Sequence, residues 1–132
     1  MVKISRLKDG TKIVSLIPYS IVFSDGTYVP ACPKEVSEKF YPSKKEEECI
    51  LSSGVKVVKV VNVLSDTQKR NIEILQKEGR LVVLPRVILD ALNQDPEERV
   101  NRFGRCVGQK TTTDTLHSKP NERVADATRW MY

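Results

Sequence analysis

Short alternating apolar segments occupy the first third of the chain. The segment 11–16, "TKIVSL", follows Asp9-Gly10, and a second segment runs from Tyr19 to Ala31 around Asp25-Gly26. In the second segment, Tyr19, Ile21 and Phe23 alternate with more polar neighbours. Asp-Gly favours the positive φ angles of a tight hairpin turn. The pattern therefore predicts an antiparallel hairpin that ends near Pro30, because proline cannot donate to a strand ladder.

The central third contains two apolar runs, "VKVVKVVNVL" at 55–64 and "RLVVL" at 80–84. The first run is apolar on both faces, which is typical of an inner strand of a covered sheet. The connection between the runs is long enough for a right-handed crossover, so we expect the two strands to be parallel neighbours.

Two helices are predicted next to these strands. Ser65 and Gln68 have the spacing of a capping box, Ile72 and Leu75 mark a core stripe, and Gly79 supplies the stop. Pro85 suits the first turn of a second helix. The buried face of that helix is predicted to carry Ile88, Ala91 and Leu92.

The remaining segments give weaker patterns. Residues 34–54 predict a helical turn around Val36–Phe40 and then a mobile loop, in which "KKEEE" is a solvated face. Residues 99–114 predict a final strand pair around Gly104. Residues 121–132, "NERVADATRWMY", predict a short helix capped by Asn121, with Val124, Ala127 and Met131 on one side.

Together these elements predict a mixed α/β fold. A small single sheet would contain the N-terminal antiparallel hairpin and a central parallel βαβ unit, with two main helices and a short C-terminal helix. We expect one mixed α/β domain over residues 1–110, followed by a basic tail or docking helix over residues 111–132.

Chain length and cysteine content exclude several classes of protein. A chain of 132 residues buries enough surface to need no disulfide or metal. Cys32, Cys49 and Cys106 are widely spaced, and His117 is the single histidine, so neither a disulfide framework nor a zinc site is expected. The first ten residues lack a signal peptide, and the apolar runs are too short to cross a bilayer. These features predict a soluble, cytoplasmic protein with no membrane partner.

The charge is unevenly distributed. Residues 99–132 carry seven Lys/Arg and three acids, out of 22 bases and 17 acids in the whole chain. The basic excess is therefore almost wholly C-terminal. Such asymmetry suggests an anionic partner, either a nucleotide or a nucleic acid.

The first strand–helix turn contains Ser65, Thr67 and Lys69. A helix N-terminus after a strand offers free N–H groups and the positive end of the helix dipole to a phosphate. However, this turn has no glycine, and Asp66 would repel an anion. The simpler interpretation is that Ser65 is only a helix cap.

The second strand–helix turn contains Arg86. If the two strands are parallel neighbours, Arg86, Ser65 and Thr67 converge at the sheet edge where α/β proteins usually bind ligands. The alternative is an ordinary exposed arginine. An arginine at a helix N-terminus gains nothing from the dipole, which favours a functional reason for it.

The C-terminal third adds Arg102 and Arg105, which flank Phe103 in "RFGR". An aromatic ring among arginines can stack on a base, although core packing is the more common role of such a phenylalanine. We include both arginines among the candidate ligand-binding residues.

A different class of function is protein–protein interaction or self-assembly through the C-terminal segment. Trp130, Met131 and Tyr132 are of residue types that are enriched at interfaces. This interpretation predicts a homo-oligomer that uses these three residues.

Catalysis has little support, because no Ser-His-Asp, HExxH or paired-acid motif is present. We predict no catalytic residues, no metal and no cofactor. A metal-free nuclease or nucleotide-degrading enzyme remains as a third hypothesis. The leading hypothesis is a non-catalytic protein that binds an anionic ligand.

Three segments, "LIPYSIVFSDG", "GRLVVLPRVILDAL" and "RFGRCVGQK", occur in an order and at distances that resemble a group of small bacteriophage and prophage proteins. That group more usually has histidine at the position of Tyr19 and serine at that of Pro85. The resemblance implies no particular activity. It implies a small viral accessory protein that acts in the host cytoplasm.

Overall fold

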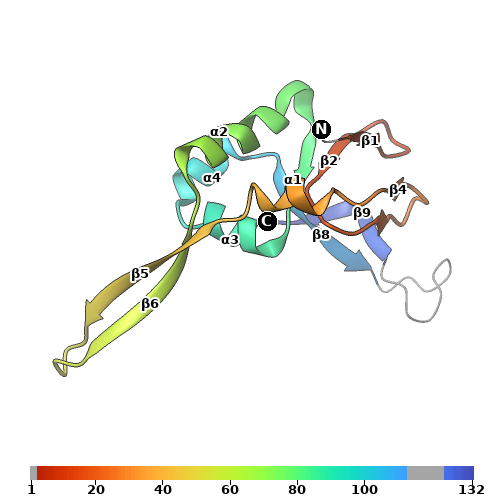
Figure 1. Cartoon of the computed structure of the whole chain (residues 1–132). Coiled ribbons are helices and arrows are strands. Elements are labelled where there is room, and N and C mark those ends of the chain that lie inside the picture. The colour runs from red at the N-terminus through yellow and green to blue at the C-terminus, as the bar shows by residue number, and fades with distance from the viewer. Residues whose placement is uncertain (1–2, 113–123) are drawn as a thin grey trace.

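The computed structural model describes residues 3–112 and 124–132. Its centre is a five-stranded sheet with the order β1-β2-β7-β8-β9 (Figure 1). These strands are β1 (Ile4–Arg6), β2 (Lys12–Ser15), β7 (Leu81–Val83), β8 (Cys106–Thr112) and β9 (Val124–Met131).

The sheet combines both kinds of strand pairing. β2 pairs with β7, and β7 with β8, in parallel, whereas β1 and β9 add antiparallel edges. A βαβ unit does exist, and it runs from β7 through two helices to β8. The predicted mixed α/β fold is confirmed.

The predicted hairpin around Asp25-Gly26 is also confirmed, although it forms a two-stranded sheet of its own and is not part of the main sheet. β3 (Ile21–Val22) pairs antiparallel with β4 (Tyr28–Val29). Gly26 has a φ of 90°, and the Asp25 carboxylate accepts hydrogen bonds from the Thr27 and Lys8 N–H groups at 2.8 and 3.0 Å. Asp-Gly therefore does form the turn, but Asp25 does not have a positive φ, so the turn is not the type with two positive φ angles that the sequence suggests.

Both predicted central helices are present. α2 (Asp66–Leu75) begins at Ser65 with a complete capping box, and α3 (Arg86–Leu92) begins after Pro85. The short α1 (Lys34–Glu38) overlaps the predicted helical turn, and a 3-10 turn follows α2 at Lys77–Gly79.

The strand pair predicted around Gly104 is wrong in its first half. Residues Pro96–Arg102 form α4, and only β8 follows it. Asp95 caps this helix by accepting a hydrogen bond from the Glu98 N–H at 3.1 Å, and Pro96 occupies the first turn. The segment "DPEE" is thus a helix start signal, which outweighs the strand-like residues after it.

The predicted C-terminal helix is also wrong, because residues Val124–Met131 form β9. The proposed cap, Asn121, lies outside the described residues. β9 pairs antiparallel with β8 from Thr112↔Val124 to Gly108↔Met131. An eight-residue segment is weakly helical by itself, and pairing with the open edge of β8 decides its conformation. The boundary predicted at residue 110 falls inside β8.

The sheet buries apolar side chains on both faces. Val82 belongs to a cluster on the helix side, with Ile72, Ile88 and Phe103. Val83, the next residue of β7, belongs to a cluster on the other side with Phe23. This alternation follows from the pleat of a strand and makes β7 the central strand of the fold.

The largest departure from the predicted fold is a long two-stranded arm. β5 (Ser43–Ile50) and β6 (Lys56–Val63) pair antiparallel over eight residues each and project away from the sheet (Figure 1). The predicted mobile loop is therefore a strand. The run at 55–64 is not an inner strand beside β7, because β2 and β8 occupy both sides of β7.

None of the helices in the described part of the chain is long and apolar enough to cross a membrane.

Candidate functional site

A cleft of about 320 Å³ lies at the carboxyl ends of the three parallel strands β2, β7 and β8. Apolar side chains in its lining are Ile17, Leu84, Leu89 and Met131. Polar groups come from Tyr19, Arg86, Gln109 and Thr111. This edge of a parallel sheet is where α/β folds bind ligands, and the volume is at the lower end of the range for small-molecule sites.

Tyr19 and Gln109 face each other across this cleft. Tyr19 follows the end of β2, and Gln109 lies in β8 beyond the last residue paired with β7. The Gln109 side-chain amide donates a 2.7 Å hydrogen bond to the Tyr19 hydroxyl. This bond holds the two side chains in place, while 56% of Tyr19 stays exposed. A tyrosine ring that is held but accessible can stack on a flat ligand.

Gly108 allows the close packing beneath the cleft. A Cβ atom at this position would lie 2.8 Å from Leu89 Cδ1 and 3.4 Å from Met131 Cβ. A side chain here would force the Leu89 side chain to move or α3 to shift. The glycine therefore leaves room for the Leu89 side chain at the floor of the cleft.

Arg86 provides the cation of the cleft. It is the first residue of α3, directly after the β7 turn, and is mostly exposed. Its Nε atom lies 2.9 Å from the Asp90 carboxylate one turn later, and its guanidinium donates a 3.5 Å hydrogen bond to the Tyr132 backbone oxygen. An exposed i,i+4 pair is weak, so an anion could displace Asp90 from Arg86.

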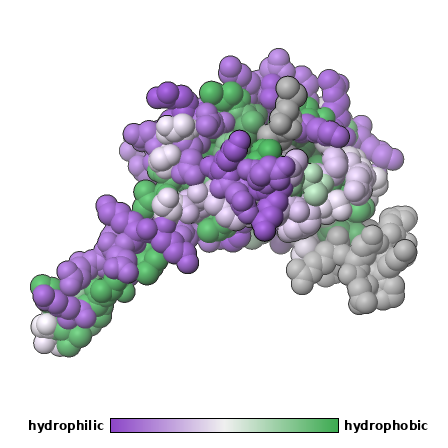
Figure 2. Space-filling view, viewed as in Figure 1, coloured by the Kyte–Doolittle hydropathy of each residue, from purple (hydrophilic) through white to green (hydrophobic). Residues whose placement is uncertain are grey.

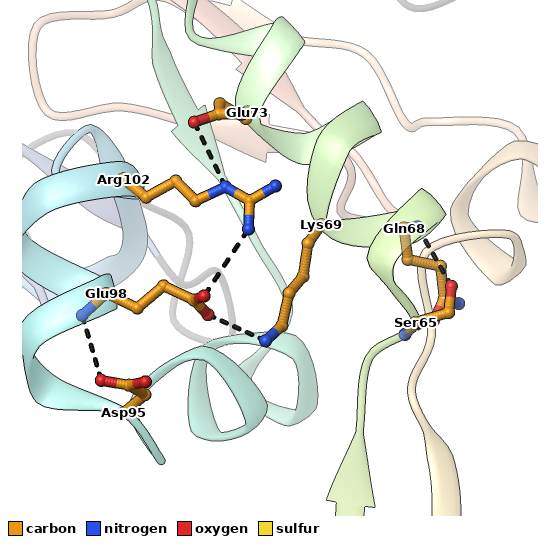
Figure 3. A network of polar contacts seen from close by, with 7 residues as sticks. All are labelled: Ser65, Gln68, Lys69, Glu73, Asp95, Glu98 and Arg102. Atoms are coloured by element: carbon orange, nitrogen blue, oxygen red, sulfur yellow. Dashed lines mark hydrogen bonds and ion pairs between the residues drawn. The ribbon is translucent and has the colours of Figure 1, made fainter.

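Ser65, Thr67 and Lys69 do not join Arg86. They follow β6, which lies outside the five-stranded sheet, so the two strand–helix turns do not share an edge. The Ser65 hydroxyl accepts from the Gln68 N–H at 3.1 Å, as expected of a helix cap (Figure 3). Thr67 is exposed on α2. The predicted convergence of Ser65, Thr67 and Arg86 is therefore wrong.

Lys69 and Arg102 belong to an ion-pair network between α2 and α4 (Figure 3). Glu98 lies 2.9 Å from Lys69 Nζ and 3.5 Å from Arg102, and Glu73 lies 3.2 Å from Arg102. These cations are partly buried and already paired with carboxylates. The network holds two helices together and does not offer unpaired positive charge to a ligand.

Arg105 lies at the opposite end of the sheet from the cleft, immediately before β8. Its side chain donates to the Arg80 carbonyl at 3.3 Å, and its backbone N–H donates to Gln76 at 2.8 Å. Of the six predicted ligand-binding residues, only Arg86 lines the cleft.

Arg99 accounts for part of the C-terminal basic excess in a way that the sequence did not indicate. Only 1% of this residue is exposed. Its guanidinium donates to the side chain of Asn93 at 2.8 Å and to the Phe103 and Cys106 carbonyl oxygens. The Tyr132 ring lies 3.9 Å above it. Arg99 is thus a structural crosslink between α4, β8 and the C-terminal residue.

The predicted interface residues lie on or after β9. Trp130 is half-buried, with its ring 5.5 Å from that of Phe23. Met131 lines the cleft, and Tyr132 covers Arg99. All three therefore have contacts within the chain. Their role in an interface stays a prediction.

The three cysteines are free and differ in exposure. Cys32 and Cys106 are buried, whereas Cys49 is exposed on the arm. Burial raises the pKa of the Cys106 thiol to about 12. Among the described residues, no three His, Cys, Asp or Glu side chains gather as a metal site would require. His117 lies outside those residues.

A second, smaller cleft of about 160 Å³ lies beside β1, between Lys3, Ser5 and the segment Val29–Pro33. It does not lie at the carboxyl ends of the parallel strands. The larger cleft is therefore the candidate site.

The sequence pattern missed Tyr19 and Gln109 because both were assigned to other elements. Tyr19 was placed inside the hairpin, and residue 109 in an edge strand pair. The one available signal was the short strand at 11–16. A strand at 11–16 that pairs in parallel with 80–84 puts the residues after it at the ligand-binding edge.

No protein-family model matches this chain, and neither does any curated protein or solved structure. The resemblance to phage proteins thus stays a prediction.

Proposed function

We propose that this protein binds a small nucleotide in the cleft at the carboxyl ends of β2, β7 and β8. The observation that carries the proposal is the combination of Arg86 with the hydrogen-bonded Tyr19 and Gln109 pair around one cleft. Arg86 would bind the phosphate, the Tyr19 ring would stack on the base, and Gln109 would contact polar edges of the ligand.

Charge distribution favours a mononucleotide or a small cyclic nucleotide over a nucleic acid strand. A strand requires a row of accessible cations that follows its phosphates. Lys69 and Arg102 are paired with carboxylates, and Arg99 is buried. The cleft offers a single cation, Arg86, among its lining residues.

The resemblance to phage accessory proteins extends the proposal to the place of action. We propose that binding takes place in the host cytoplasm and that it is non-catalytic. Incubation with the bound nucleotide, followed by chromatography, separates binding from turnover. Recovery of an unchanged ligand supports a binding protein, whereas a new product would support the nucleotide-degrading enzyme.

Fluorescence titration with labelled mono-, cyclic and oligonucleotides at low salt tests the site. Replacing Arg86→Ala should weaken binding by about tenfold to a hundredfold, because hydrogen bonds to charged groups contribute about 1.5–3 kcal/mol. Asp90→Asn should strengthen binding, because Asp90 competes with the phosphate for Arg86 at 2.9 Å.

Arg105→Ala is the matched control, since it removes an exposed cation at the other end of the sheet. Its affinity should stay within about twofold of the unchanged protein. Equal losses for Arg86→Ala and Arg105→Ala would indicate a general charge effect and would contradict a site in the cleft.

A further inference from the structure

The β5–β6 arm exposes several large apolar side chains close together. All eight residues of β5 are exposed, as are Val58 and Val60 of β6. At the tip, 70% of Ile50 is exposed. Hydrophobic and hydrophilic residues lie side by side along the arm (Figure 2). A two-stranded hairpin without a covering layer is marginally stable in water, so this arm is incomplete as a monomer.

The outer edge of β5 has unsatisfied backbone groups at alternate residues. Leu51 N–H donates to the Val55 carbonyl at 2.9 Å, so the pair at 51 and 55 is hydrogen-bonded. Hydrogen-bonded pairs alternate along an antiparallel ladder. The even-numbered residues of β5, which are Lys44, Glu46, Glu48 and Ile50, therefore direct their N–H and C=O groups outward.

An independent contact confirms this alternation. Lys44 is paired with Asn62, and the Asn62 carbonyl accepts a 2.7 Å hydrogen bond from the Gln94 side chain outside the arm. The Asn62 carbonyl therefore points away from β5. The same contact partly covers the base of the β6 edge, whereas β5 has no such cover within the described residues.

The order of charges on β5 is self-complementary. The sequence from Lys44 to Glu48 is Lys-Lys-Glu-Glu-Glu. In an antiparallel pair of two β5 strands centred on Glu46, each Lys44 would lie opposite a Glu48 and each Lys45 opposite a Glu47. This register also places outward-directed residues opposite one another, so their backbone groups can bond. This register has four complementary pairs and one like-charge pair, Glu46 with Glu46. Moving its centre to Lys45 leaves two complementary pairs and one like-charge pair, and moving it to Glu47 gives three like-charge pairs and no complementary pair.

We propose that two copies of this chain associate through their β5 edges, antiparallel and centred on Glu46. The two arms would form one four-stranded sheet around a twofold axis. Three residue pairs, 44 with 48, 46 with 46 and 48 with 44, would exchange backbone hydrogen bonds. Charges on an edge ordinarily oppose pairing, but here their order matches a second copy.

The ends of the arm fit the same arrangement. Ile50 at the tip of one arm would lie opposite Pro42 at the base of the other, next to the exposed Tyr41. Pro42 lacks an N–H and directly precedes β5, which is where a proline is tolerated at the end of a ladder. Association would thus cover the exposed tip of each arm with the base of its partner.

The β6 edge and a nucleic acid are poorer occupants. Pairing two β6 strands brings no acid opposite Lys56 or Lys59, because β6 contains no acidic residue. The two strands of the arm carry four lysines and three glutamates, so they lack the basic excess that a nucleic acid requires.

Charge reversal with complementation tests the proposal in the full chain. Sedimentation should detect a dimer of the unchanged protein. Lys44→Glu with Lys45→Glu turns all four complementary pairs into like-charge pairs and should weaken the dimer by about a hundredfold or more. Glu47→Lys with Glu48→Lys should do the same. A mixture of the two variants should dimerise again, because every reversed pair is complementary in the mixed dimer.

The control is Lys56→Glu, which puts a negative charge on β6 opposite Ile50 and so adds no like-charge pair inside the arm. Its dimer should persist. Three results would overturn the proposal. They are a monomer at every soluble concentration, a dimer that survives both β5 charge reversals, and a mixture of the two variants that fails to associate. Growth into long polymers would place β5 on the β6 of the next copy and would also overturn it.

A cysteine pair tests the register. Ser43 should lie opposite Cys49 of the second copy, at a non-hydrogen-bonded position where the strands approach closely. Within one chain the two residues are six positions apart on one strand, too far to bond. The Ser43→Cys variant should therefore form a covalent dimer on oxidation. Lys45→Cys, which would face Cys49 only after a two-residue shift, should not, and the reverse result would refute this register.

In the proposed dimer, Glu46 with Glu46 of the second copy is the single like-charge pair. Removing that repulsion should tighten the dimer, which a general loss of folding could not do. Glu46 faces its own copy across the twofold axis. Glu46→Gln should therefore tighten the dimer by about twofold to fivefold. An unchanged or weaker dimer would contradict a twofold axis at this residue.

Discussion

β6 and β7 contain similar residues and lie in opposite environments. β7 reads Leu-Val-Val and is almost fully buried between two parallel strands and the helices. β6 contains five valines in eight residues and is largely exposed, with a single neighbour in the described chain. Apolar composition thus predicts a strand in both cases. The number of neighbouring strands and covering layers decides whether that strand belongs to the core.

The same contrast holds for charged residues. In the body of the fold, which is the five-stranded sheet with its helices, Lys69 and Arg102 are paired with carboxylates from a different helix. Arg99 is buried there under an aromatic ring. On the arm, lysines and glutamates of β5 are exposed. Charges in the body stabilise contacts within the chain, whereas the β5 charges, apart from Glu47 opposite Lys59, match the proposed contact with a second copy. Four experiments test this comparison.

Thiol reactivity should differ most between the two regions. Burial raises the pKa of Cys106 in the body from 9.0 to about 12, which lowers its thiolate fraction by about a thousandfold near pH 8. Cys49 on the arm is exposed. Mass spectrometry after brief treatment with a thiol reagent should find Cys49 modified and Cys106 intact, and both modified in denaturant. Rapid modification of Cys106 in the folded protein would contradict its burial.

Removing a buried cation should be the next largest effect. Arg99→Met leaves the Phe103 and Cys106 carbonyl oxygens without their donor, so unfolding should become easier by about 2–4 kcal/mol. Lys59→Met on β6 removes an exposed cation and should change stability by less than about 0.5 kcal/mol. Urea unfolding measures both. Similar values for the two variants would remove the distinction between body and arm.

Replacing one valine by alanine in β7 and one in β6 tests the comparison directly. Val82 is fully buried, so Val82→Ala should destabilise the fold by about 2–3 kcal/mol through lost burial and a cavity. Val58 is 58% exposed, and Val58→Ala should cost less than about 0.5 kcal/mol. Thermal unfolding at a concentration where the chain is monomeric provides the measurement. A large loss at Val58 would mean that the arm is covered even in the monomer.

The smallest effect concerns acid stability of the body. Hydrogen bonds from Thr128 and Arg129 lower the pKa of Asp126 below its ordinary value of 3.8. A carboxyl whose pKa is lower in the folded state stabilises the fold above the unfolded pKa and loses that contribution as pH falls through the folded pKa. The stability difference between the unchanged protein and Asp126→Asn should therefore be constant above about pH 4 and shrink below it. A difference independent of pH would contradict this assignment.

Local signals predicted the helices α2 and α3 well. Ser65 and Gln68 cap the start of α2 with a capping box, and Pro85 fixes the backbone just before α3 without a side-chain cap. Neither signal requires a distant partner. The hairpin at Asp25-Gly26 formed for the same reason. The "DPEE" start of α4 is a local helix signal of the same kind.

The candidate site depended on strand order and was predicted only in part. Arg86 was placed correctly at a strand–helix turn, because that turn is local. Its expected companions came from β6, which is absent from the main sheet. Its actual companions, Tyr19 and Gln109, are 90 positions apart and meet because β2 and β8 flank β7.

The sequence by itself determined where the main turns and two central helices lie, since caps, prolines and glycines act within a few residues. It also contained the charge order of β5. Only the tertiary structure decided which strands are neighbours: β2 and β8 beside β7, β9 against β8, and β6 out on the arm. Strand partners are chosen by contacts between distant segments, and an apolar run carries no information about which edge it will meet.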